Sequence, residues 1–269
     1  MKKLTKGLLL SLALASPLAA QAHNFWLMPS QTVLSGDSDN WITVDAAVSN
    51  DLFYFNHVPL NIAGLTISAP DGQAVAAVNQ HKGKLRSSFD VHLEKEGTYK
   101  LAVVNNGIFA RYELDGEAKR LRGSLADIET LPAKAKKVEI TESQSRVETF
   151  ATVGAPSKTA LAPTGKGLEL EAVTHPNDLY ATEKADFRLL LDGKPAKNIK
   201  VVIIRGDTRY RDNLNEIELT TDKNGAFSVT WPDAGMYWLE ASVADKNTSV
   251  KKAKTRRAVY VATFEVLPQ

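Results

Sequence analysis

The chain has 269 residues, with 33 lysines and arginines against 31 acidic side chains, five histidines and no cysteine. This composition excludes a fold held by disulfides and a cysteine nucleophile, and the near balance of charge excludes a strongly basic nucleic-acid-binding protein. A hydrophobic content of 43% is typical of globular domains.

The first 22 residues predict a secretory signal peptide. Lys2, Lys3 and Lys6 precede an almost wholly apolar run over residues 8–20, and Ala20-Gln21-Ala22 fits a small-x-small cleavage site. The run is too short to span a bilayer comfortably, and no later stretch is long or apolar enough. We therefore expect cleavage after Ala22 and a protein that is exported, most simply to a bacterial periplasm, and is not membrane-embedded. Without the three lysines, 30 basic side chains remain against 31 acidic ones, a net charge of about −1.

Short alternating segments in the first half of the mature chain predict strands. They cover the residues after His23, then 41–48, 65–68, 85–93 and 98–104. Residues 105–165 are less regular. They contain a short segment with helical character at 123–129 and two further expected strands at 138–141 and 146–153. We expect residues 23–161 to form an N-terminal β-sandwich domain with an irregular extension.

A Pro- and Gly-containing segment at residues 162–167 is the best linker in the sequence. After it, seven expected strands follow at even spacing, at 168–174, 185–191, 199–205, 217–220, 226–231, 236–243 and 258–266. This count and rhythm predict an immunoglobulin-like or transthyretin-like sandwich over residues 168–269. The predicted fold class is all-β, with two β-sandwich domains.

One pattern occurs twice with an offset of 138 residues. Phe89, Val91, Gly97, Tyr99 and Leu101 match Phe227, Val229, Gly235, Tyr237 and Leu239. We interpret each copy as a β-hairpin at the edge of a sandwich, so the repeat predicts architecture and not chemistry.

Four segments carry a resemblance to a known family. They are Gly167–Leu179, Leu191–Pro195, Arg209–Arg211 and Thr221–Leu239. With them, nearly the whole mature chain resembles the bacterial exported proteins grouped as domain-of-unknown-function family 4198, whose members are often labelled periplasmic components of cobalt or nickel transport systems. The resemblance implies two sandwiches, export, a connection to metal and a partner among inner- or outer-membrane transport components. It implies no reaction and no site residues, and the chain lacks the His-rich, Met-rich or acidic tracts of many metal-handling periplasmic proteins.

His23 is the sharpest candidate for chemistry. After cleavage behind Ala22 it is the first mature residue, so its α-amine and imidazole can chelate one metal ion, and a second histidine would complete an N3 set suited to Cu(II), or to Ni(II) or Zn(II) with added oxygen ligands. His57, on the aromatic-rich connection 51–57, is the preferred second ligand, and Asp45 or Asp51 would add a carboxylate. The alternatives remain that some residue must follow any cleavage site and that His57 is a structural histidine.

The other histidines have simpler interpretations. His81 lies in a polar loop and His92 points outward from a strand, whereas His175 precedes a proline and is expected to cap or pack at the domain entrance. Glu169 and Glu171 lie two apart on a strand, which favours a solvated sheet face. Arg205, Arg209 and Arg211 favour an internal ion-pair cluster around Asp207.

Three functions follow. The first is a periplasmic protein that binds divalent Ni, Co, Cu or Zn through His23 and His57, as an accessory to metal uptake or tolerance. The second is a metal-free interaction module that binds a membrane partner or a surface glycan. The aromatic residues 25–26 and 53–55 would form its platform, with the alternative that most rings at strand positions are core. The third is a copper enzyme with an N-terminal histidine brace. Since no other catalytic motif is present, we favour a non-enzyme without organic cofactor.

Overall fold

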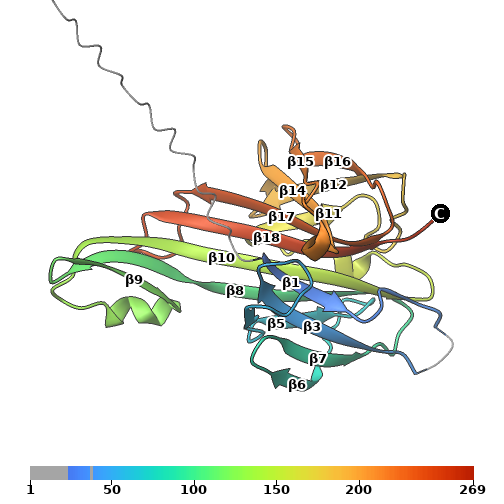
Figure 1. The fold of residues 1–269 in the computed structure, drawn as a ribbon, viewed down its shortest axis with the longest axis horizontal. Coiled ribbons are helices and arrows are strands. Elements are labelled where there is room, and N and C mark those ends of the chain that lie inside the picture. The colour runs from blue at the N-terminus through green and yellow to red at the C-terminus, as the bar shows by residue number, and fades with distance from the viewer. Residues whose placement is uncertain (1–23, 37–38) are drawn as a thin grey trace, which may run out of the picture.

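The structure is a computed structural model that describes residues 24–36 and 39–269, so the predicted signal peptide and His23 lie outside the described residues. The described chain is almost entirely β-structure arranged in three sheets (Figure 1). The predicted all-β fold class is confirmed. No helix in the described part of the chain is long and apolar enough to cross a membrane.

The first sheet comes from the N-terminal part of the chain and has the order β1-β3-β7-β6, with β4 also paired to β3. Its strands are β1 (Asn24–Pro29), β3 (Trp41–Ser49), β4 (Val58–Pro59), β6 (Val78–Lys82) and β7 (Ser87–His92).

The second sheet, here called the central sheet, joins strands from both halves of the chain in the order β15-β14-β17-β18-β10-β8-β5, with β2 paired to β10 and β9 paired to β8. Its strands are β2 (Val33–Leu34), β5 (Leu65–Ser68), β8 (Gly97–Leu114), β9 (Glu117–Gly123), β10 (Lys136–Val153), β14 (Lys200–Arg205), β15 (Ile217–Thr220), β17 (Gly235–Asp245) and β18 (Thr255–Val266).

The third sheet comes from the C-terminal part and has the order β11-β12-β13, with β16 paired to β12. Its strands are β11 (Leu168–Ala172), β12 (Lys184–Leu191), β13 (Lys194–Pro195) and β16 (Ala226–Thr230). Three short 3-10 helices complete the described chain: η1 (Leu125–Thr130), η2 (Thr159–Leu161) and η3 (Thr208–Tyr210).

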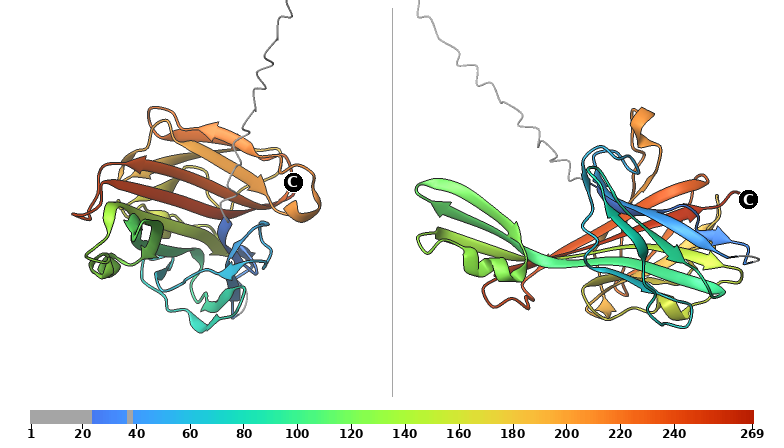
Figure 2. Two further views of the ribbon diagram at one scale, coloured as in Figure 1. Left: turned by 60° about the vertical axis from the view of Figure 1, so that its left-hand side comes forward. Right: turned by 90° about the horizontal axis from the view of Figure 1, so that it is seen from below.

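The three sheets form three layers, with the central sheet in the middle (Figure 2). Val259 and Val261 of β18 belong to the core shared with the first sheet. The alternating residues Tyr260, Ala262 and Phe264 belong to the core shared with the third sheet. Both faces of β18 are covered, and its residues 258–262 are a continuous apolar run, which is typical of a strand buried on both sides.

The two halves of the chain are joined by a parallel ladder between β10 and β18, from Thr141 opposite Thr255 to Thr149 opposite Thr263. All seven strands predicted after the linker are present, with the two-residue β13 in addition. The division of the chain at 162–167 remains a prediction. Hydrogen bonding in the central sheet connects strands from both sides of that division.

The repeated pattern is not a hairpin, and this prediction is wrong. In both copies the two strands belong to different sheets, since β7 and β16 lie in the outer sheets whereas β8 and β17 lie in the central sheet. The Tyr99 hydroxyl donates to the Lys95 carbonyl (3.1 Å) and accepts from the Lys95 N–H (2.7 Å). The Tyr237 hydroxyl makes the same two bonds with Asp233 (2.8 and 3.3 Å). Each copy is thus the tyrosine corner of an immunoglobulin-like sandwich, where the chain crosses between sheets.

Residues 105–165 are more regular than predicted. The two strands expected at 138–141 and 146–153 are one 18-residue strand, β10, and β8 is equally long. Strand β9 was not expected, and the helical segment expected at 123–129 is the 3-10 helix η1. His81 lies in the exposed strand β6 and not in a loop.

Candidate functional site

The start of β1 and His57 lie at the same end of the first sheet, on opposite sides of β3. Asn24 of β1 is paired with Ser49. On the other side of β3, Val58 is paired with Val48, so His57 directly precedes that pair. Asn24 and His57 flank β3 on its two sides, so two spacings between adjacent strands, about 10 Å in all, separate their backbone positions. This end of the sheet therefore brings together the position to which His23 is covalently attached and the exposed side chain of His57.

The connection that carries His57 is held by side-chain hydrogen bonds. Ser49 Oγ donates to the Asp51 carbonyl (2.6 Å), and Asp51 Oδ2 accepts from Asn56 Nδ2 (2.7 Å). Asn56 Oδ1 in turn accepts from the backbone N–H of Asn50 (2.9 Å). The residue next to His57 is thus tied back to the end of β3, which positions His57 on an ordered segment.

Aromatic packing anchors the same connection to the core. Trp26 is fully buried and donates its indole N–H to Ser49 Oγ (2.8 Å). The rings of Phe53 and Phe55 pack against it, with centroids 5.5 and 5.6 Å away. Phe25 also packs against this core. These rings support the fold, so the platform expected for a partner or glycan is largely core.

Asp51 and Asp45 occupy different places. Asp51 is half-buried at the sheet end, two residues beyond Ser49. Asp45 is paired with Met28, four positions along β3 from Ser49, which is about 13 Å at the strand rise. Asp45 forms an ion pair with Arg86 (3.2 Å), and although burial raises the pKa of Asp45, that guanidinium opposes the shift. The structure thus brings Asp51, but not Asp45, to the end of the sheet where His57 lies.

The remaining histidines lie apart from this end. His92 stacks on Trp41 (centroids 4.4 Å apart) and contacts Asp39 and Glu94. His175 is buried between the central and third sheets, as expected for a residue that packs at the domain entrance. Within residues 24–36 and 39–269, no group of three or more histidine and acidic side chains is placed to hold a metal ion.

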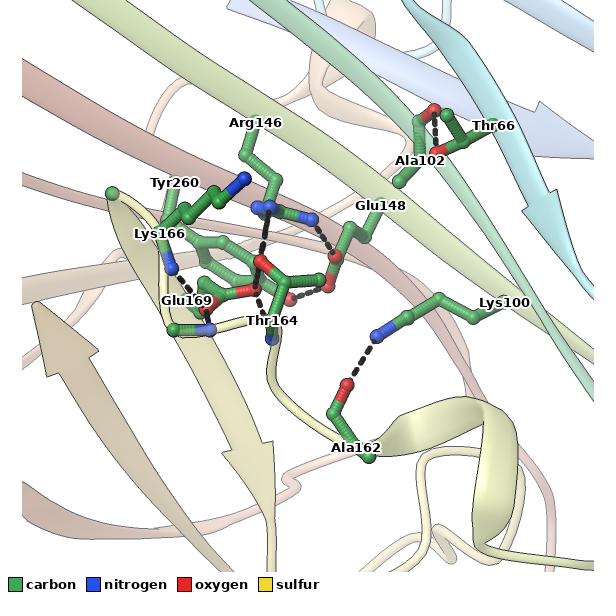
Figure 3. A network of polar contacts seen from close by, with 12 residues as sticks. Thr66, Lys100, Ala102, Arg146, Glu148, Ala162, Thr164, Lys166, Glu169 and Tyr260 are labelled. Atoms are coloured by element: carbon green, nitrogen blue, oxygen red, sulfur yellow. Dashed lines mark hydrogen bonds and ion pairs between the residues drawn. The ribbon is translucent and has the colours of Figure 1, made fainter. Parts of the chain in front are cut away.

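A buried charged network lies between β10 and β11 (Figure 3). Arg146 contacts Glu148 (3.1 Å) and Glu169 (3.3 Å), and all three are at most 8% exposed. The Tyr260 hydroxyl donates to Glu148 (2.8 Å). Burial and the Glu148 carboxylate raise the pKa of Tyr260 well above its ordinary value, which keeps the hydroxyl protonated as a donor.

The solvated face expected for Glu169 is therefore wrong. Glu169 also accepts the backbone N–H groups of Thr164 (2.9 Å), Gly165 (2.7 Å) and Lys166 (3.1 Å), so the predicted linker folds around its carboxylate. Glu171 pairs with Arg188 instead. Sequence spacing placed the two acids on one side of a strand, but no sequence signal indicated that Arg146 would cover that side.

A cavity of about 530 Å³ adjoins this network and is lined in part by Arg146 and Arg256. The Arg256 guanidinium is bound by Asp245 (3.0 and 2.6 Å) and by Asp192 (2.7 Å). Arg256 is only 4% exposed, whereas the nearby lysines Lys251, Lys252 and Lys254 are exposed. Because protein carboxylates already neutralise both arginines, we interpret the network as structural.

The arginine cluster predicted around Asp207 pairs elsewhere. Arg205 contacts Asp233 (3.6 Å) and donates to the Ala234 carbonyl (3.0 Å). Arg211 donates to the Arg205 carbonyl (2.6 Å), and Arg209 lies over the ring of Tyr54, 5.4 Å from its centroid. Of the three arginines, Arg205 alone pairs with a carboxylate in the described chain, so the ion-pair cluster predicted around Asp207 is wrong.

A family model described as "Domain of unknown function (DUF4198)" matches residues 20–245. The chain belongs to this family. The match covers the whole of the candidate site and every described strand before β18, and its description names no reaction. No curated protein matches the sequence.

Solved structures resemble this DUF4198 chain only distantly. The D0-D1 domain of intimin is 13% identical, with 88% of this chain and 96% of that chain covered and a TM-score of 0.22. Salmonella alpha-2-macroglobulin is 13% identical over 90% of this chain and 15% of that chain, with a TM-score of 0.23. The Yersinia pseudotuberculosis adhesin InvE is 13% identical over 90% of this chain and 58% of that chain, with a TM-score of 0.21. At these values the likenesses carry no argument about function.

Proposed function

We propose that this DUF4198 chain is an exported protein that binds one divalent transition-metal ion through its mature N-terminus. The ligands are the α-amine and imidazole of His23 and the imidazole of His57, and the protein serves as an accessory to metal uptake or tolerance. The observation that supports this proposal is the shared level of Asn24, Ser49 and His57 across β1, β3 and β4.

The chemistry of this donor set fits the proposal. Three nitrogen ligands suit Cu(II), and they suit Ni(II), Co(II) or Zn(II) when an oxygen ligand is added. Asp51 lies at the same sheet end and can supply that oxygen. Because the described residues contain no three-ligand group by themselves, a site at His57 depends on the two nitrogen donors of His23.

The ordered connection 49–57 also supports the proposal. A ligand on a segment fixed by hydrogen bonds and aromatic packing holds its position before the metal arrives, which reduces the entropy lost on binding. The bonds from Asn56 and the packing of Phe55 act on the two residues that precede His57.

Calorimetric titration of Cu(II), Ni(II), Co(II) and Zn(II) into the mature protein tests the proposal, after mass spectrometry has established that His23 is the first residue. We expect one tight equivalent. A methionine placed before His23, or His57→Ala, should weaken binding by more than about 100-fold, because losing even a residue that only supports a ligand costs 10- to 100-fold. His81→Ala, on exposed β6 of the same sheet, is the matched control and should bind as the parent does.

Parent-like binding by either His23 or His57 variant would place the site elsewhere. A dissociation constant no lower than about 10 μM, which corresponds to roughly −7 kcal/mol, would contradict the metal-binding proposal and favour an interaction module instead. The Cu(II)-loaded protein, mixed with a reductant and an oxidant, should consume neither catalytically. Turnover would favour the histidine-brace enzyme.

A further inference from the structure

A β-sheet arm extends away from the three-layer body (Figures 1 and 2). It consists of the outer part of β8, the whole of β9, η1 and the first part of β10, and the loop between β17 and β18 packs against it. We define the arm as residues 105–140 together with the loop residues 246–254.

One face of the arm is covered by the protein itself. Ile108, Ala110 and Ile140 of the strands pack with Ile128 of η1 in a small core. The partly buried residues Leu121, Leu131, Val138, Val250 and Ala253 complete this core. Helix η1 and the β17–β18 loop therefore close this side, and the opposite side of the same strands is an uncovered sheet face.

The uncovered face carries three exposed arginines. Arg111 of β8 is directly opposite Arg120 of β9, and Arg122 is opposite Phe109 in the adjacent pair. Like charges directly opposite one another destabilise a strand pair. Glu139 of β10 is opposite Arg111 on its other side. Even so, none of the three arginines forms an ion pair in the part of the chain that the structure describes.

The arm also concentrates positive charge. Its residues include 11 lysines and arginines and 6 acidic side chains, a net charge of +5, and four of the lysines belong to the loop residues 246–254 on the covered side. The rest of the chain after residue 22 has 19 basic and 25 acidic side chains, a net charge of −6. The net charge of the mature chain is near −1 and by itself predicts no attraction to an anionic surface. This sum combines a basic arm with an acidic body.

We propose that the face formed by Arg111, Arg120, Arg122 and Phe109 docks on the phosphate head groups of an anionic lipid membrane. Guanidinium groups bind phosphate through two parallel hydrogen bonds, which lysine does not do. Phe109 is half-buried among the arginines, with the Arg111 guanidinium 5.4 Å from its ring centroid, and adds an apolar element suited to the membrane interface.

The charge distribution favours a membrane over an acidic protein. The face is one open side of the arm's strands, and repulsion turns the acidic body away from an extended anionic plane, so the arm alone makes the contact. This docking does not depend on the metal site, because the two lie on different sheets.

Vesicle sedimentation of the mature protein tests the proposal, with phosphatidylglycerol–phosphatidylethanolamine vesicles compared with pure phosphatidylcholine. The parent should bind only the anionic vesicles, and less as salt increases. The triple variant R111Q/R120Q/R122Q should lose about 100-fold in affinity, from about 5-fold for each arginine. Replacing three exposed lysines outside the arm, K82Q/K194Q/K197Q, changes the net charge equally and should leave binding at the parent level.

Thermal unfolding separates docking from folding. Since Arg111 and Arg120 repel each other, the triple variant should melt at the parent temperature or above it. Equal binding by the triple variant and the parent, or equal binding to phosphatidylcholine, would overturn the proposal. Failure of the parent to bind anionic vesicles at low salt would also overturn it and would favour an acidic protein as the partner.

Discussion

The imidazole Nε2 of His175 lies 2.9 Å from the Oγ1 of Thr98, where the segment between β11 and β12 meets the central sheet. The same nitrogen lies 3.2 Å from the Ser157 carbonyl, and Nδ1 accepts the backbone N–H of Asn177 (3.2 Å). Because Nδ1 accepts, the hydrogen-bond pattern assigns the proton of the neutral ring to Nε2. A second proton on Nδ1 would face the Asn177 N–H.

This geometry predicts a loss of stability in mild acid. Burial lowers the pKa of His175 below its ordinary value of 6.5. The unfolded state therefore binds the proton more readily, so the stabilisation is complete above pH 6.5 and is lost as the pH falls toward the lower folded pKa. Urea unfolding at pH 7.5 and pH 5.0 measures this loss. His175→Gln should reduce the difference in the free energy of unfolding between pH 7.5 and pH 5.0, whereas the exposed His81→Gln should not.

Breaking the buried network should strongly destabilise the protein. Arg146→Met leaves the buried carboxylates of Glu148 and Glu169 without their cation, and loss of one partner of a buried ion pair costs about 3–5 kcal/mol. The exposed pair of Lys200 and Glu218 provides the control, since Lys200→Met should cost less than about 1 kcal/mol. Denaturant unfolding of both variants decides the matter. Equal costs would contradict the assignment of a structural role to Arg146.

Glu142 should control the β17–β18 loop. Its carboxylate accepts the backbone N–H and the hydroxyl of Ser249 (both 2.7 Å). Burial raises the pKa of Glu142, but these bonds and those from Gln144 and Val250 together lower it. Glu142→Gln should release the loop and accelerate tryptic cleavage after Lys251 and Lys252, which mass spectrometry detects. The exposed Glu139→Gln on the same strand should leave the rate unchanged. A parent-like rate for Glu142→Gln would show that other contacts hold the loop.

Ser49 should be required for the packing of Trp26. Ser49→Ala removes the acceptor of a fully buried indole N–H, and an unsatisfied buried donor costs about 1–3 kcal/mol. Ser88→Ala, on neighbouring β7, should change the free energy of unfolding by less than about 0.5 kcal/mol. Chemical denaturation compares the two. A neutral result for Ser49→Ala would mean that the indole finds another acceptor.

Local sequence signals predicted most strands of the fold but not their partners. The seven strands after residue 167 were found because alternation and turn residues are local properties. The corners at Tyr99 and Tyr237 were mistaken for hairpins, because alternation does not reveal that consecutive strands lie in different sheets. The sequence predicts β10 as two pieces because its polar centre, residues 142–145, resembles a break. In the structure, buried contacts of Glu142 and Arg146 satisfy that centre.

The candidate site could be predicted only in part. His57 and Asp51 were chosen from a connection rich in aromatic residues, and the structure places them at one sheet end. Asp45 is the alternative carboxylate that the sequence predicts, yet the register of β3 sets it four positions from Ser49. The level that Asn24 shares with His57 depends on the pairing of β3 with two strands at once, which no single-sequence pattern encodes. The sequence analysis does not predict the face formed by Arg111, Arg120 and Arg122, because acidic side chains elsewhere cancel its charge in the net charge of the whole chain.

The position of β18 determines how the chain can assemble. This strand, the last in the sequence, lies between β10 and β17, and its partners in β10 precede it by 114 residues. Until residues 255–266 are in place, both neighbours expose unpaired edges of the kind that pair with other chains. Contacts of such long range slow folding. The twelve-residue strand β18 therefore completes the central sheet by pairing with both exposed edges. A chain cut before Thr255 should accumulate as aggregates rather than as a smaller folded protein.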